Sequence, residues 1–106
     1  MLFFVLPVWA QDYTGWLIAG GGVDDLFLII KNENGQELSG YCDKASVCSD
    51  WDALFKEDEN GAYVLKRKYF KKKVRVRIIE RANNGEIAGP SDDEVLPFIT
   101  QFRFLD

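Results

Sequence analysis

Residues Lys66–Arg81 read KRKYFKKKVRVRIIER, and this stretch decides the fold class. It holds nine of the thirteen basic residues of the chain and a single acid, Glu80. Its second half alternates strictly between apolar and basic side chains, in the order Lys73, Val74, Arg75, Val76, Arg77, Ile78. A period of two is typical of a strand with one buried and one solvated face. The stretch therefore predicts a core strand of an antiparallel sheet whose other side carries a row of positive charge.

The charge of the rest of the chain is opposite in sign. The chain has 106 residues, enough for one domain, and a net charge of −4. Residues 66–81 carry nine basic residues and one acid, a net charge of +8, whereas the remaining residues carry four basic and sixteen acidic ones, a net charge of −12. Such an asymmetry can attract an anion locally in an acidic protein. The alternative is that carboxylates on neighbouring strands neutralise the basic row.

The chain contains no histidine. This absence excludes Ser-His-Asp and Cys-His catalysis and removes the commonest zinc ligand. Two cysteines, Cys42 and Cys48, bracket five residues. In an exported protein this spacing predicts a local disulfide, which would stabilise by roughly 2 kcal/mol. A redox-active pair is the alternative, although the spacing is not Cys-x-x-Cys.

The first ten residues, MLFFVLPVWA, are apolar and give way abruptly to polar sequence. Val8 and Ala10 fit the small-residue positions before a signal-peptidase cut, although no basic residue precedes the apolar run. We therefore expect residues 1–10 to be a truncated signal peptide, residues 11–106 to form the single mature domain, and the protein to be secreted or periplasmic. The alternative is that this segment is the first strand of the fold.

Turn signals support an all-β fold. Asn-Gly, the strongest short-range hairpin signal, occurs at residues 34–35, 60–61 and 84–85, and predicts type I′ turns between antiparallel strands. Three consecutive glycines at 20–22 predict a bulge, a sharp corner or a close backbone approach.

One segment, Ser49–Lys56, has the pattern of a helix. Ser49 can cap it, and Trp51, Leu54 and Phe55 fall on one face, which we expect to plug one end of the sheet. The last strand is expected at residues 98–105. Its predicted core face consists of Phe98, Thr100, Phe102 and Phe104.

The phrase YFKKKVRV, residues 69–76, is similar to the start of strand four in OB-fold domains, where lysines precede a Val-x-Val pattern. A helix between strands three and four, here Ser49–Lys56, is another feature of that fold. With its expected leader, the chain resembles small exported bacterial OB-fold proteins. The predicted fold is thus all-β with one short helix, a small antiparallel OB-like barrel of five to six strands. A two-sheet β-sandwich is the alternative.

The first functional hypothesis is a non-enzymatic binding module. Its basic face would consist of Lys73, Arg75 and Arg77, with Arg103 beside them. Alternate strand residues lie about 6.6–7 Å apart, a spacing that can follow repeated anionic groups. The expected partner is an anionic envelope polymer or a protein, because an exported protein meets little nucleic acid. We expect the protein to be a monomer that has neither a cofactor nor a membrane-spanning segment.

Two alternatives rest on acidic residues. Asp50 with Asp52, or the acidic loop Asp92, Asp93 and Glu94, could serve a carboxylate-dependent hydrolase acting on glycans. Asp92, Asp93 and Glu94, with Asp24 and Asp25 as further candidates, could instead bind calcium, because oxygen-only ligands suit a hard cation. No EF-hand pattern is present.

Overall fold

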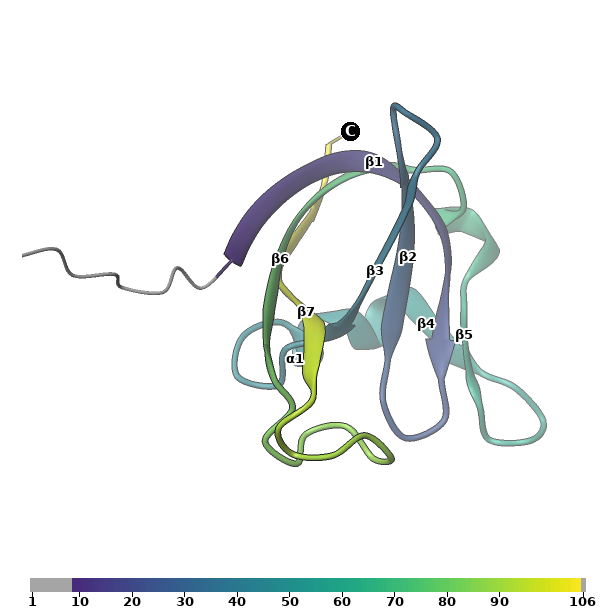
Figure 1. Cartoon of the computed structure of the whole chain (residues 1–106). Coiled ribbons are helices and arrows are strands. Elements are labelled where there is room, and N and C mark those ends of the chain that lie inside the picture. Colours follow the sequence, from purple (N-terminus) through teal and green to yellow (C-terminus); the bar gives the residue numbers. More distant parts are fainter. Residues whose placement is uncertain (1–8, 106) are drawn as a thin grey trace, which may run out of the picture.

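The structure, a computed structural model, describes residues 9–105 (Figure 1). Residues 1–8 of the expected signal peptide lie outside this range, and its last two residues, Trp9 and Ala10, belong to the first strand. They pair with Glu80 and Ile79. None of the helices in the described part of the chain has the length and apolar character needed to span a bilayer.

Within residues 9–105, seven strands and three short helical segments follow one another. Their bounds are β1 Trp9–Gly22, β2 Phe27–Asn32, β3 Glu37–Cys42, α1 Cys48–Trp51, the 3-10 turn η1 Asp52–Leu54, β4 Phe55–Glu57, β5 Tyr63–Leu65, the 3-10 turn η2 Arg67–Tyr69, β6 Lys73–Ala82 and β7 Val95–Phe104. The prediction of an all-β fold with one short α-helix is confirmed.

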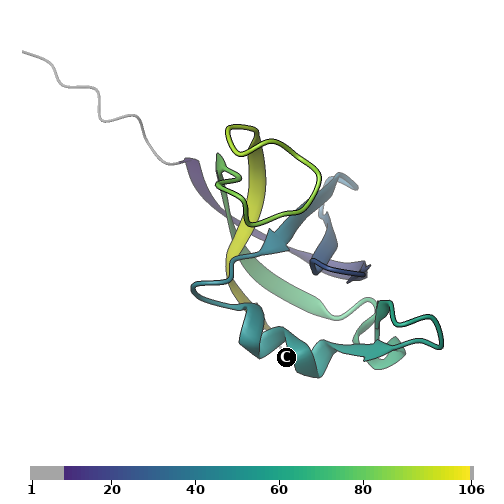
Figure 2. The ribbon, with the colours of Figure 1, turned by 90° about the horizontal axis from the view of Figure 1, so that it is seen from below.

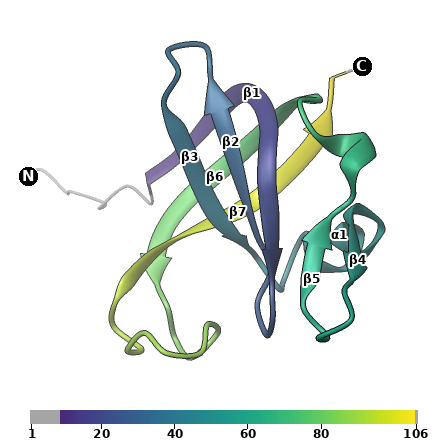
Figure 3. The same ribbon diagram turned by 90° about the vertical axis from the view of Figure 1, so that its right-hand side faces the viewer.

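The strands form one sheet in the order β2-β3-β7-β6-β1-β5-β4, and an additional pairing of β2 with β1 joins five of them into a ring. The ring is barrel-like, and β4 with β5 forms a short hairpin beside it (Figure 3). Most pairings are antiparallel, but β3 runs parallel to β7 over two residue pairs, Tyr41 with Phe98 and Cys42 with Ile99. The sheet is therefore mixed, and the described residues form one sheet instead of the two of a sandwich.

The long strand β1 serves two neighbours. Its first half pairs with β6 and its second half with β2, and the two pairings overlap at Gly15 and Trp16. A Cβ at Gly15 would lie 2.4 Å from the carbonyl oxygen of Lys31, so the strand crossing requires glycine. At the end of β1, a Cβ on Gly21 would lie 2.4 Å from the Tyr63 oxygen. The glycine run thus provides a close backbone approach, one of the three expected roles.

The three Asn-Gly pairs all lie between antiparallel strands, but they form two kinds of turn. At residues 34–35 and 60–61 only the glycine has a positive φ, and the side chains of Asn32 and Asp58 accept backbone hydrogen bonds across the turn. Only at Asn84-Gly85 are both φ angles positive, 51° and 78°, as a type I′ turn requires. The predicted type was therefore wrong for the first two turns, because a side-chain oxygen preceding each one stabilises another geometry.

The interior of the ring is filled by aliphatic residues from β1, β2 and β6, among them Leu17, Ile30 and Val76. Trp51 is fully buried and meets Phe102 edge-on at a centroid distance of 6.2 Å. The predicted plug is confirmed, but its helix is shorter than expected, because the chain enters a 3-10 turn at Asp52 and a strand at Phe55. Val47 is the N-cap residue in place of Ser49.

A second, smaller core lies on the outer side of the sheet. The ladder between β6 and β7 shifts register next to Thr100. The alternation of side chains is reversed across this bulge, so two β7 residues that would share one face of a regular strand lie on opposite faces of the sheet. Phe102 and Phe104 pack on the main core, whereas Phe98 packs with Ile87 and Leu96 in the outer cluster. The predicted single Phe-rich core face was therefore wrong at Phe98, and Ile99 takes the inner position. Figure 2 shows the loop between β6 and β7 on one side of the barrel and α1 on the other.

The disulfide between Cys42 and Cys48 is present, with Cα atoms 5.2 Å apart. It joins the end of β3 to the start of α1. The plug is thereby tied to the strand that completes the ring.

Candidate functional site

The structure divides the basic stretch of the sequence into two parts. Residues 66–72 form η2 and the tight turn after it, and we call this whole segment the lysine turn. Strand β6 begins at Lys73. Figure 3 shows this turn leading into β6 at one end of the ring, while the loop between β6 and β7 lies at the other end. The basic stretch therefore forms two separate surfaces, one on the lysine turn and one on β6.

The outer surface of β6 carries the predicted basic face. Here Val74, Val76 and Ile78 are buried, and the alternating Lys73, Arg75 and Arg77 point outward, as the period of two predicts. Arg103 lies beside them on β7, where it pairs with Arg75 across the ladder. The structure thus places all four predicted residues on neighbouring strands.

Asp12 on β1 lies directly opposite Arg77 and neutralises part of this face. Its carboxylate accepts hydrogen bonds from Arg77 Nε at 2.7 Å and Nη2 at 3.2 Å, and a longer one from Arg75 Nη2 at 3.4 Å. The hydrogen bond from Arg77 is the main cause that lowers the pKa of Asp12, and the same bond raises the pKa of Arg77. Cross-strand neutralisation, the alternative raised from the sequence, therefore supplies a single carboxylate, which Arg77 and Arg75 share.

Arg103 has no ion-pair partner within residues 9–105. Its cross-strand neighbour is another arginine, Arg75, and the two guanidinium groups share a pocket of about 190 Å³ with Arg77, Asp12 and Gln101. Like charges placed directly opposite each other on two strands repel. The pocket combines three arginines with one carboxylate, so it keeps a net positive charge.

Lys73 lies apart from this pocket. Its ammonium group lies 5.9 Å from the ring centre of Trp16, the residue it pairs with on β1. It lines a different pocket, with Lys72, Tyr69 and Phe104. Of the four predicted residues, the structure therefore groups the three arginines and places Lys73 next to the lysine turn.

The acidic candidates are solvated. Asp50 and Asp52 are exposed on α1 and η1, and so are Asp92, Asp93 and Glu94 in the loop before β7. Ser91 Oγ donates a hydrogen bond to Asp93 at 2.8 Å. Within residues 9–105, no group of three or more acidic or cysteine side chains is arranged to hold a metal ion.

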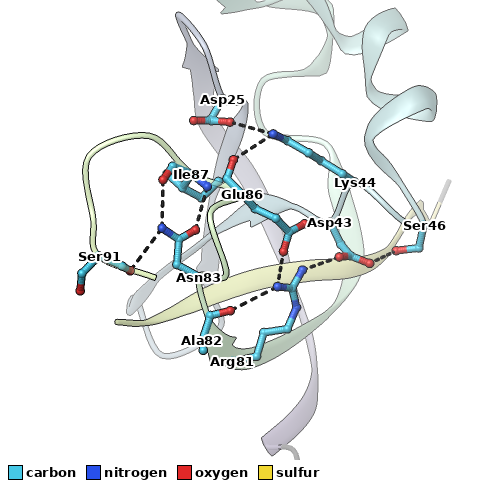
Figure 4. A network of polar contacts seen from close by, with 10 residues as sticks. All are labelled: Asp25, Asp43, Lys44, Ser46, Arg81, Ala82, Asn83, Glu86, Ile87 and Ser91. Carbon is cyan, nitrogen blue, oxygen red and sulfur yellow. Dashed lines mark hydrogen bonds and ion pairs between the residues drawn. The ribbon is translucent and has the colours of Figure 1, made fainter. Parts of the chain in front are cut away.

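A network around Arg81 was not expected from the sequence (Figure 4). Arg81 donates to Asp43 at 2.6 Å and to Glu86, and its guanidinium group lies 3.7 Å from the ring centre of Phe98. The hydrogen bond with Glu86 is the main cause that raises the pKa of Arg81. The adjacent Asn83 is fully buried and exchanges hydrogen bonds with both backbone groups of Ile87. The network fastens the loop between β6 and β7 over the outer core, so it explains the loop's position without a ligand.

Of the acids that pair with the basic residues, some lie in a pattern that the sequence shows and others do not. Asp12 belongs to an alternating run with Thr14 and Trp16, so a longer first strand could have been predicted to include it, whereas its pairing with Arg77 is a matter of strand register. Asp43 and Glu86 reach Arg81 from loops 38 and 5 residues away along the chain. No local pattern predicts that convergence.

Comparison of the chain with protein-family models, with curated proteins and with solved structures finds no match.

Proposed function

We propose that this protein is an exported, non-enzymatic binding module with an OB-like barrel, and that it binds an anionic polymer of the cell envelope through Arg75, Arg77 and Arg103. The five-stranded ring with a short helix between β3 and β6 supports the OB-like assignment. The disulfide supports an oxidising compartment.

The juxtaposition of Arg75 and Arg103 carries the proposal. A like-charge pair across two strands is unfavourable, and Asp12 reaches Arg75 only through a long contact of 3.4 Å. A sulfate, phosphate or carboxylate between the two guanidinium groups would turn the repulsion into two charge-assisted contacts. The side chain of Arg75 is 46% exposed, so a ligand can reach it without rearrangement of the sheet. Asp12 holds Arg77 by a two-pronged contact and thereby fixes one wall of the pocket.

The test is a binding series on the full oxidised chain with heparin, lipopolysaccharide and single-stranded DNA at increasing salt. Binding by arginine contacts should weaken steeply with salt, because it releases counterions. An Arg75→Glu/Arg103→Glu variant should lose binding to the preferred polymer. Lys56→Glu, a charge change of the same sign at an exposed position of β4, is the control. Equal binding by the double variant and the wild type would refute the proposal.

A further inference from the structure

The lysine turn exposes an aromatic ring at its tip. Phe70 is 47% exposed, whereas the preceding Tyr69 is packed face-on against Phe104 at a centroid distance of 5.2 Å. Five basic residues flank Phe70 in the sequence, and none of them forms an ion pair within residues 9–105: Lys66, Arg67, Lys68, Lys71 and Lys72. An exposed apolar side chain thus belongs to a segment of unpaired basic residues.

The turn is held in place by backbone hydrogen bonds. Lys72 N–H donates to the Tyr69 oxygen at 3.2 Å, and Lys71 N–H donates to the Leu17 oxygen at 2.7 Å. Leu17 N–H donates in return to the Lys72 oxygen at 2.9 Å. The tip is therefore anchored to β1, and the exposure of Phe70 follows from the geometry of the turn.

Lys71 occupies a position that favours glycine. Phe70 has φ −62° and ψ 134°, and Lys71 has φ 66°, which are the angles of the two central residues of a type II turn. A residue with a Cβ is strained at the second of these positions, and such strain is found at functional sites more often than elsewhere. At the tip of this strained turn, Phe70 and Lys71 are consecutive residues and both are exposed.

From this geometry we propose that the lysine turn docks the protein onto an anionic lipid surface. Phe70 enters the boundary between headgroups and acyl chains, and Lys68, Lys71 and Lys72 contact the lipid phosphates. Interfacial segments combine an apolar face with lysines or arginines in this manner, and long lysine stems let the charge remain in water while their methylenes lie on apolar surface. Each basic residue near an anionic leaflet adds attraction. This surface lies outside the arginine pocket, so the inference goes beyond the proposed function.

The aromatic residues of the turn favour lipid over nucleic acid. Single-stranded nucleic acid needs several free ring faces on which successive bases stack. Tyr69 has one face against Phe104 and Lys68 5.1 Å from its ring centre, and Trp16 has Lys73 over its ring. Phe70 alone is left free in this group, which suits insertion better than stacking.

The test is co-sedimentation of the full oxidised chain with phosphatidylcholine vesicles prepared with and without phosphatidylglycerol. Wild-type protein should bind only the vesicles that contain phosphatidylglycerol. Phe70→Ala should weaken that binding about tenfold, because a half-inserted ring is lost. Lys71→Gln/Lys72→Gln should weaken it about thirtyfold, since two attractions to the leaflet are removed.

Val95→Ala is the matched control for the apolar change, because Val95 is 61% exposed at the start of β7, away from the turn. It should bind vesicles like the wild type. Vesicle binding that is unaffected by Phe70→Ala, or that needs no phosphatidylglycerol, would overturn the proposal. The proposal would also be overturned if variants of the lysine turn lost their binding to single-stranded DNA but still bound the vesicles. Arg75→Glu/Arg103→Glu should keep its vesicle binding, so failure of this inference is distinguishable from failure of the arginine site.

Discussion

The two halves of the basic stretch differ in what surrounds their charges. In β6, Arg75, Arg77 and Arg81 meet acids supplied by other segments, namely Asp12, Asp43 and Glu86. In the lysine turn, which is continuous with β6 in sequence, no basic side chain forms an ion pair within residues 9–105. Position in the fold thus decides which cations of the stretch meet an acid of the same chain and which remain unpaired.

The residue types follow the same division. Arginine has a planar fork that binds carboxylates through two parallel hydrogen bonds, as Arg77 does with Asp12. Lysine is a compact, strongly hydrated charge on a flexible stem, which is suited to a loose, solvated contact. We expect the loss of a paired arginine of β6 to alter stability as well as polymer binding, and the loss of a lysine charge in the lysine turn to alter association with little effect on stability.

The largest effect is expected from Arg81→Met. This change leaves the carboxylates of Asp43 and Glu86 without their partner in a site where all three side chains are at most 25% exposed. The free energy of unfolding should fall by roughly 3 kcal/mol. Chemical denaturation measures the change. Lys72→Met is the control in the lysine turn and should stay within about 0.5 kcal/mol of the wild type; equal losses in the two variants would erase the distinction.

Removal of the disulfide should have the next largest effect. Cys42→Ala/Cys48→Ala should lower the free energy of unfolding by about 2 kcal/mol, because the unfolded chain loses a constraint. Asp43, the partner of Arg81, follows Cys42 directly. The stability lost on removing the disulfide should therefore be smaller when Arg81→Met is already present. A double-mutant cycle measures that coupling, and strict additivity would show that the disulfide does not position Asp43.

Asp12→Asn tests whether the carboxylate competes with a ligand. Removal of its charge should raise the affinity of the basic face for an anionic polymer several-fold, as a competing anion close to two arginines is lost. Titration with the preferred polymer measures the change. Weaker binding would instead show that Asp12 is needed to position Arg77.

The same variant gives a pH dependence. The pKa of Asp12 is lowered below its ordinary value of 3.8 by Arg77, so its contribution to stability is fully present above that value. It is lost as the pH falls further, through the lowered pKa. The stability difference between the wild type and Asp12→Asn should therefore be constant near neutral pH and shrink below pH 3.8, as followed by denaturation at each pH. A difference that grows on acidification would contradict the assignment.

The smallest effect is expected from Lys71→Gly. Glycine relieves the strained φ of 66° but loses more backbone entropy on folding, so stability should rise by less than about 1 kcal/mol. Thermal unfolding measures this change. A clear loss of stability would show that the lysine side chain makes a structural contact.

Much of the fold was predictable from local patterns. The alternation of residues 73–78, the turn positions and the disulfide spacing are short-range signals, and each corresponds to an observed element. The outward direction of Lys73, Arg75 and Arg77 was predictable for the same reason. The bulge beside Thr100 was not, because it depends on the partner strand, and it sends Phe98 to the outer core. The division between paired and unpaired cations also depends on contacts between segments remote in sequence.

The most direct test of this division is a crossed binding measurement. Arg75→Glu/Arg103→Glu and Lys71→Gln/Lys72→Gln are each titrated with the preferred anionic polymer and with vesicles containing phosphatidylglycerol. The arginine variant should lose the polymer and keep the vesicles, and the lysine variant should lose the vesicles and keep the polymer. Parallel losses of both ligands in both variants would contradict the account, because they would show one undivided basic surface acting through net charge.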